Sequence, residues 1–101
     1  MKDFILLMYD DAPDPKAASD GASWGSYFSS LHASGQFDGG SSIGLGTRFR
    51  KKFPDQESGS GVSGFIRVRA EDLAHAKAFL AGNPIYEAGG TVEIRELPRD
   101  E

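Results

Sequence analysis

A short, uninterrupted apolar run near the N-terminus constrains this chain most. The run extends from Phe4 to Tyr9, and acidic and proline residues follow it at once. A run of this length, bounded in this way, is typical of a β-strand that is buried on both faces. The sequence therefore predicts a sheet that is covered on each side.

An amphipathic helix is predicted for residues 20–34. Ser19 or Asp20 can cap its start, and Gly35 can end it. Its serines make it intrinsically weak, so packing of one apolar face must stabilise it. That face is formed by Trp24, Tyr27, Phe28 and Leu31.

Three further strands and a second helix follow along the chain. Residues 37–43 are a candidate strand, and the alternating segments 64–70 and 91–97 are predicted strands. A helix is expected from about Glu71 to Ala81, between the last two strands. Its buried stripe is expected to be Leu73, Ala76 and Leu80.

The segment from 44 to 63 is rich in glycine and cations. We expect a long mobile connection here, or an irregular hairpin, because such residues offer little apolar surface to bury. Within it, residues 48–53 mix cations with two phenylalanines. This stretch is either a solvated loop, a basic lid over an anionic ligand, or a nucleic-acid contact.

The order of elements predicts the fold class. Strand–helix–strand occurs twice, which is the βαββαβ pattern of ferredoxin-like α+β folds. We expect one domain over residues 1–101, with a four-stranded antiparallel sheet and two helices on one face. A chain of 101 residues buries only about two-thirds of its unfolded surface. A second copy is the simplest cover for the other sheet face, so a homodimer is predicted.

Composition argues against several classes of function. The net charge is −4 and the pI is about 5.1, which disfavours a large nucleic-acid surface. There is no cysteine, so disulfides and thiol chemistry are excluded, and a cytoplasmic location is favoured. The two histidines, His32 and His75, lack metal-ligand spacing, and we expect neither a metal nor a cofactor. No apolar run is long enough to span a membrane.

Charged residues alternate with the apolar residues of the last two strands. If the apolar residues face the helices, Arg67 and Arg95 face the opposite side, together with Phe65, Arg69, Glu93 and, from the preceding strand, Asp38. Buried charges are costly unless they are paired. Two interpretations follow: a salt-bridge lattice that closes the dimer, or a small pocket with a spare arginine for a carboxylate or phosphate.

The second interpretation defines a candidate site. A small anion is predicted on the helix-free face, beside Trp24 or Tyr27 and held by Arg67 or Arg95. The candidate ligand-binding residues are Trp24, Tyr27, Asp38, Arg67 and Arg95. An RNA-binding module shares this strand–helix order, but Arg67 stands where its second stacking aromatic belongs.

Three segments resemble the YCII-related, or DGPF-type, domain family. They are the opening MKDFILLMYDD, the pattern W-x-x-Y-x-x-x-L-x-x-x-G from Trp24 to Gly35, and the close EDLAHAKAFLAGNPIYEAGGTVEIREL. The resemblance implies a dimeric α/β-barrel in which two ferredoxin-like sheets face each other. It implies little about activity, although a few relatives are associated with lyase-type chemistry on small molecules. For this chain we expect a small anionic metabolite to bind in a cleft of the barrel, with lyase- or isomerase-type activity as one alternative.

One position departs from the family pattern. The YCII branch uses a His–Asp pair, and its histidine stands eleven residues before the helix-ending glycine. Trp24 occupies that position in this chain, whereas His32 matches a different family histidine. The resemblance therefore leaves two alternatives: a modest enzyme that acts on a small anionic metabolite, or a non-catalytic regulatory or accessory dimerisation domain.

Overall fold

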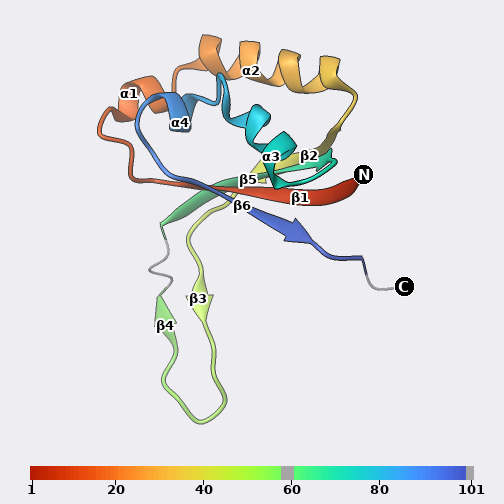
Figure 1. Ribbon diagram of the computed structural model, residues 1–101. Coiled ribbons are helices and arrows are strands. Elements are labelled where there is room, and N and C mark those ends of the chain that lie inside the picture. Colours follow the sequence, from red (N-terminus) through yellow and green to blue (C-terminus); the bar gives the residue numbers. More distant parts are fainter. Residues whose placement is uncertain (58–60, 100–101) are drawn as a thin grey trace.

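The sheet is antiparallel and four-stranded, and it carries the helices on one face (Figure 1). The computed structural model describes residues 1–57 and 61–99. The strand order is β2-β5-β1-β6, which confirms the predicted ferredoxin-like α+β fold. The four strands are β1 (Lys2–Tyr9), β2 (Phe37–Ser42), β5 (Val62–Ala70) and β6 (Val92–Leu97).

The longest helix matches the prediction closely. Helix α2 spans Gly21–Ser34. At its start, the Asp20 carboxylate accepts a hydrogen bond from the Ser23 backbone amide at 2.9 Å. At its end, Gly35 adopts a left-handed conformation with φ of 70°, which glycine tolerates without a Cβ clash. Burial of Tyr27 and Leu31 then fixes the helix on the sheet.

The second predicted helix is shorter and less regular than expected. Helix α3 covers only Leu73–Ala76 and passes directly into a 3₁₀ turn, η1, at Lys77–Leu80. The expected burial of Leu73 is wrong, since this residue is 53% exposed, whereas Ala76 is buried. Leu80, within η1, is partly buried and packs against the core as expected, whereas Leu73, the first residue of α3, points to solvent.

Two one-turn helices were not expected from the sequence. Helix α1 spans Pro15–Ala18 and helix α4 spans Pro84–Glu87. Each begins with a proline directly after a residue whose side chain caps the helix, Asp14 in the first case and Asn83 in the second. Pro84 is thus the first residue of α4, three residues after the predicted end of the preceding helix.

The core lies between the sheet and the helices. In β1, alternate side chains point to this core, and Phe4, Leu6 and Met8 are buried there. Ile5 and Leu7 lie on the helix-free face and remain half-buried in the single chain. The predicted strand is thus confirmed, but only one of its faces is covered within one copy.

The connection between β2 and β5 forms a hairpin that projects on the helix-free side of the sheet (Figure 1). Strand β3 (Thr47–Arg48) pairs antiparallel with β4 (Gln56–Glu57). We call residues 43–57 the hairpin arm. Residues 58–60 of the predicted connection lie outside the described residues, and its predicted mobility stays a prediction.

Candidate functional site

A pocket lies where helices α1 and α2 overhang strands β2 and β5. We call it the α2 pocket, and its volume is about 430 Å³. Both helices and both strands contribute to its wall, so residues far apart in the sequence meet here. Its aromatic side chains on the helix-covered side are those of Trp24, Phe28 and Phe37, and the serines that line it are Ser19, Ser41, Ser42 and Ser63.

Two strand glycines leave room for this pocket. Gly40 pairs with Ile66 across β2 and β5, and Gly64 pairs with Ser42. Neither glycine has a side chain to fill the space beneath the rings of α2. A Cβ at Gly40 would lie 2.3 Å from the backbone oxygen of Phe65, so the strand backbones approach too closely for any other residue.

Aromatic contacts fix the roof of the α2 pocket. The Trp24 indole N–H donates to the carbonyl oxygen of Ala18 at 2.8 Å, which ties α2 to the end of α1. The Trp24 ring stacks on Phe28 with centroids 5.6 Å apart and planes 27° apart. Phe28 in turn lies 6.0 Å from Phe37, centroid to centroid. The rings hold one another in place and offer a flat apolar surface to a ligand.

The hydroxyl groups of the pocket differ in their availability. The hydroxyl of Ser19 donates to the carbonyl of Pro15 at 2.8 Å, and that of Ser63 donates to Met8 at 3.3 Å. Ser41 likewise donates to a neighbouring backbone oxygen. The Ser42 hydroxyl makes no hydrogen bond to any residue within 1–57 or 61–99. It is therefore the hydroxyl that is free to bond a ligand oxygen.

No charged side chain lines the α2 pocket among the residues that the structure describes. A smaller hollow of about 190 Å³ adjoins it and shares four of its lining residues. This hollow adds Tyr9 and the carboxylate of Asp10. The charged residue that lines this adjoining hollow in the described chain is therefore an acid, which disfavours an anion there.

A larger hollow, of about 600 Å³, lies between α2 and α4. Small residues line it, chiefly alanine and serine, and it contains no aromatic ring in the described part of the chain. Its polar lining residues in the described chain are Ser23, Ser26 and Glu87, but it offers no flat surface on which a ring could stack. The α2 pocket is the better candidate for a specific small-molecule site.

On the helix-free face, most charges are paired. The Tyr9 hydroxyl donates to Glu93 at 2.9 Å, and Arg95 donates to the other carboxylate oxygen of Glu93 at 3.1 Å. The hydrogen bond from Tyr9, followed by that from Arg95, lowers the pKa of Glu93. The same bond to Glu93 raises the pKa of Tyr9.

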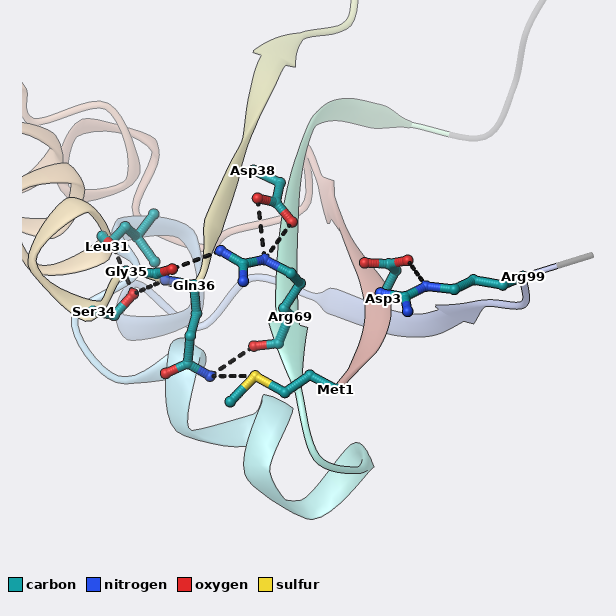
Figure 2. A network of polar contacts seen from close by, with 9 residues as sticks. All are labelled: Met1, Asp3, Leu31, Ser34, Gly35, Gln36, Asp38, Arg69 and Arg99. Carbon is teal, nitrogen blue, oxygen red and sulfur yellow. Dashed lines mark hydrogen bonds and ion pairs between the residues drawn. The ribbon is translucent and has the colours of Figure 1, made fainter.

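Figure 2 shows a second set of pairs at the opposite end of this face. Arg69 donates to Asp38 at 3.0 Å through Nε and to the Gly35 carbonyl at 2.6 Å through Nη2. These contacts join β5, β2 and the end of α2, which is a structural role. Arg67 has no hydrogen bond or ion pair to any residue in the described ranges. The interpretation of these charges as a salt-bridge lattice therefore accounts for Asp38 and Arg95, but it does not account for Arg67.

The five candidate residues fall into two groups. Trp24 and Tyr27 lie on α2, whereas Asp38, Arg67 and Arg95 lie on the opposite face of the sheet. The expected meeting of Trp24 or Tyr27 with these arginines does not occur within one chain, because the sheet itself separates them. Trp24 does line a pocket. Tyr27 is a core residue whose hydroxyl donates to the Phe79 carbonyl at 2.6 Å, and its burial raises the pKa of the phenol.

The histidines lie outside the α2 pocket. His32 stands edge-on against Phe37, with ring centroids 5.0 Å apart. His75 pairs with the capping carboxylate of Asp72 at 2.7 Å, and that hydrogen bond raises the pKa of the imidazole. The described residues contain no cluster of three or more metal-ligating side chains, and no helix among them is long and apolar enough to cross a membrane.

Sequence reasoning missed most of the α2 pocket. Phe28 was expected on the apolar stripe of the helix, Gly40 within the candidate strand 37–43, and Gly64 at the start of the strand 64–70. Nothing in the sequence indicates that α2 crosses above Gly40 and Gly64. The sequence does not single out Ser42 either, because this serine matters only for a hydroxyl that makes no hydrogen bond to a described residue, and that is visible only in the structure.

Comparison with known proteins gives a likeness in fold. No protein-family model matches the chain, and no curated protein matches it. One similar solved structure is 5-chloro-2-hydroxyhydroquinone dehydrochlorinase (TftG) from Burkholderia phenoliruptrix AC1100, in complex with 2,5-dihydroxybenzoquinone. The TM-score is 0.61 and the identity is 15%, over 97% of this chain and 95% of that chain. At this identity the likeness shows that the two proteins share a fold.

Proposed function

We propose that this protein binds a small, planar ring compound with oxygen substituents in the α2 pocket. One observation carries the proposal: an aromatic wall and an unused serine hydroxyl meet in a pocket of about 430 Å³ that no described cation lines. Apolar pockets with a few placed polar groups are the usual form of small-molecule sites. The ligand named for the structurally similar dehydrochlorinase, a dihydroxybenzoquinone, belongs to the same class of compound.

The pocket favours binding without acid–base catalysis. Trp24 takes the position of the family histidine, and its N–H is already bonded to Ala18. No carboxylate, imidazole or amine lines the pocket within the described part of the chain. Asp10 in the adjoining hollow is the closest ionisable candidate. A ligand-binding or regulatory role therefore fits better than the family's lyase-type chemistry.

Fluorescence offers a direct test, because Trp24 is the one tryptophan of the chain and lines the pocket. We expect hydroquinone, which is neutral at pH 7, to quench Trp24 emission with saturation, and 2,5-dihydroxybenzoquinone and benzoate, which are anionic at that pH, to bind more weakly because of their charge. Calorimetry with the same compounds checks that quenching reports binding and not absorption by the quinone.

Two serine variants test the location. Ser42→Ala removes the free hydroxyl and should weaken binding about two- to tenfold, the effect of one neutral hydrogen bond. Ser29→Ala is the matched control, since Ser29 lies on α2 but does not line the pocket. Equal binding by both variants, or calorimetric binding that leaves Trp24 emission unchanged, would contradict the proposed site.

We further propose that the chain is a homodimer of the YCII-related family and is cytoplasmic. The half-buried apolar residues Ile5, Leu7 and Phe65 support the dimer, because they lie on the sheet face that no helix covers. The three quoted segments support the family, and the lack of cysteine supports the location. Light scattering at low micromolar concentration should give about twice the chain mass of 10.8 kDa.

A second candidate function rests on Arg67. Its guanidinium makes no hydrogen bond or ion pair with a described residue, although its charge helps to lower the pKa of Asp3, and it lies on the face where the second copy is proposed. A small carboxylate or phosphate bound there would accept the hydrogen bonds that the guanidinium can donate. Arg67→Met should then weaken calorimetric binding of phosphate or succinate by about 1.5–3 kcal/mol. Unchanged binding would remove this candidate and leave the α2 pocket unaffected.

A further inference from the structure

The hairpin arm exposes apolar side chains that a small chain does not usually leave in water. Leu45 is fully exposed, Phe49 is 73% exposed and Phe53 is 54% exposed. The Arg50 guanidinium lies 3.9 Å from the centre of the Phe53 ring, which covers only one side of that ring. None of these residues belongs to the core formed by the described residues. Such clustered exposure marks an interaction surface.

The arm also lacks support of its own. Its two strands are two residues long each and pair only with one another. Isolated two-stranded hairpins are at best marginally stable in water. Among the described residues, the backbone hydrogen bond that fastens the arm to the sheet lies at its base, where Ile43 donates to Ser63 at 2.9 Å. A surface beyond this chain would stabilise the rest.

The direction of the arm indicates where that surface lies. The arm extends past the helix-free face, on the side where the second copy is proposed (Figure 1). One leg, residues 43–51, reaches up to about 30 Å when extended. Facing sheets pack only about 10 Å apart. The arm is therefore long enough to pass the partner's sheet and to lie along the partner's flank.

Charge favours a second copy as the occupant. The arm contains four cations and two carboxylates: Arg48, Arg50, Lys51 and Lys52 against Asp55 and Glu57. The rest of the chain contains seven cations and thirteen carboxylates. A cationic arm and an acidic body attract each other between copies. A nucleic acid would suit the arm but would be repelled by the acidic body.

We infer that the hairpin arm of each protomer clasps the body of its partner, with Phe49 and Phe53 as the apolar contacts. This inference rests on the proposed homodimer, to which it adds a second interface outside the facing sheets. Aromatic side chains give such contacts much of their affinity, and the cations beside them steer the approach.

A photo-crosslinking experiment tests the inference. Phe49 is replaced by p-benzoylphenylalanine, and Tyr86, an exposed aromatic on α4, is replaced in a control. Each protein is mixed with an equal amount of isotopically labelled chain before illumination. We expect the Phe49 derivative to give crosslinked dimers in which mass spectrometry joins the arm of one chain to the body of the other. The Tyr86 derivative should give few or none.

The outcomes separate this inference from the proposals that precede it. A wild-type chain that stays monomeric at all concentrations tested would overturn both the dimer and the clasp. A stable dimer whose Phe49 derivative crosslinks nowhere, only to the partner's arm, or to nucleic acid would overturn the clasp alone. The double variant Phe49→Ser, Phe53→Ser gives a second measure: the dimer dissociation constant should rise by about tenfold or more. No rise would also contradict the clasp.

Discussion

The two faces of the central sheet carry side chains from the same strands but differ in burial and in charge. On the helix-covered face, Leu6, Ile66 and Val68 are almost entirely buried and apolar. On the helix-free face, Leu7 and Phe65 are half-buried and stand among paired charges such as Glu93 and Arg95. A difference of one position along a strand thus decides whether a side chain stabilises the fold or remains available to a partner.

The contrast also separates the two proposed interactions. The α2 pocket belongs to the helix-covered side, where glycines leave a gap in an otherwise filled layer. The clasp and the sheet interface belong to the helix-free side, where the single chain leaves apolar surface half-exposed. Small-molecule binding and dimerisation can therefore be altered independently by substitutions on opposite faces.

The largest effect is expected from truncating the covered face. Leu6→Ala should lower the free energy of unfolding by about 2–5 kcal/mol, because it leaves a cavity among buried neighbours. Leu7→Ala is the matched change one position along, and it should cost the monomer about 1 kcal/mol or less. Urea unfolding followed by circular dichroism measures both.

Protein concentration sharpens this test. Leu7→Ala should make the unfolding midpoint less dependent on concentration, because it weakens a proposed dimer contact and so reduces the stabilisation that association adds. Leu6→Ala should leave the concentration dependence of the midpoint as in the wild type. If the two variants lose equal stability at every concentration, the two faces do not differ in the way described.

The sequence predicted the two faces well because strand alternation is a local property. Ile66, Val68, Val92 and Ile94 pack towards the helices as expected. Helix α2 was equally predictable, since its stripe and caps lie within one segment. The one-turn helices were missed because a single turn shows no periodicity, although Asp14 before Pro15 is a capping signal.

The candidate site could not be predicted to the same degree. Trp24 does not meet Arg67, and strand alternation already indicated this, because it places Arg67 on the face away from the helices. The pocket forms because α2 lies close to Gly64 in the folded chain, and this proximity depends on tertiary packing and not on any local pattern in the sequence. Arg69 was expected among the charges of this face, but its bond to the Gly35 carbonyl required the turn after α2 to be in place.

A smaller effect is expected at the edge of the covered face. Gly40→Ala would place a Cβ 2.3 Å from the Phe65 backbone oxygen and 3.1 Å from the Cα of Ile66. Backbone atoms cannot move aside cheaply, so unfolding should become easier by about 1–3 kcal/mol. Gly44→Ala, which meets no atom within 4 Å, is the control and should be close to neutral. Similar stabilities for the two variants would argue against the close strand pairing.

A stabilising change is available in the helix that covers this face. Gly25 lies inside α2, and a Cβ there would meet no atom within 4 Å. Gly25→Ala should raise the free energy of unfolding by about 0.5–1 kcal/mol, because alanine loses less backbone entropy than glycine on forming a helix. Thermal and urea unfolding both report the change. Loss of stability would mean that α2 packs more tightly at this turn than described.

The smallest effect concerns the charges of the helix-free face and shows as a dependence on pH. The pKa of Glu93 lies below its ordinary value of 4.5, chiefly because Tyr9 donates a hydrogen bond to it and secondly because Arg95 does. Its contribution to stability is therefore complete above about pH 4.5 and is lost as the pH falls through the lower folded value. The pKa of Tyr9 lies above its ordinary value of 10.0, so its contribution to stability is present below that pH and is lost as the pH rises through the folded value.

Glu93→Gln should flatten both ends of a plot of unfolding temperature against pH. The control is Glu96→Gln, which removes a carboxylate 3.7 Å from Lys2 and should leave the acidic and the basic decline of the plot as in the wild type. Substitutions on the helix-covered face should shift this plot without changing its shape, because that face contributes no paired charges of this kind in the described chain. A Glu93→Gln profile that parallels the wild type at both ends would show that the Tyr9–Glu93 bond does not form in solution.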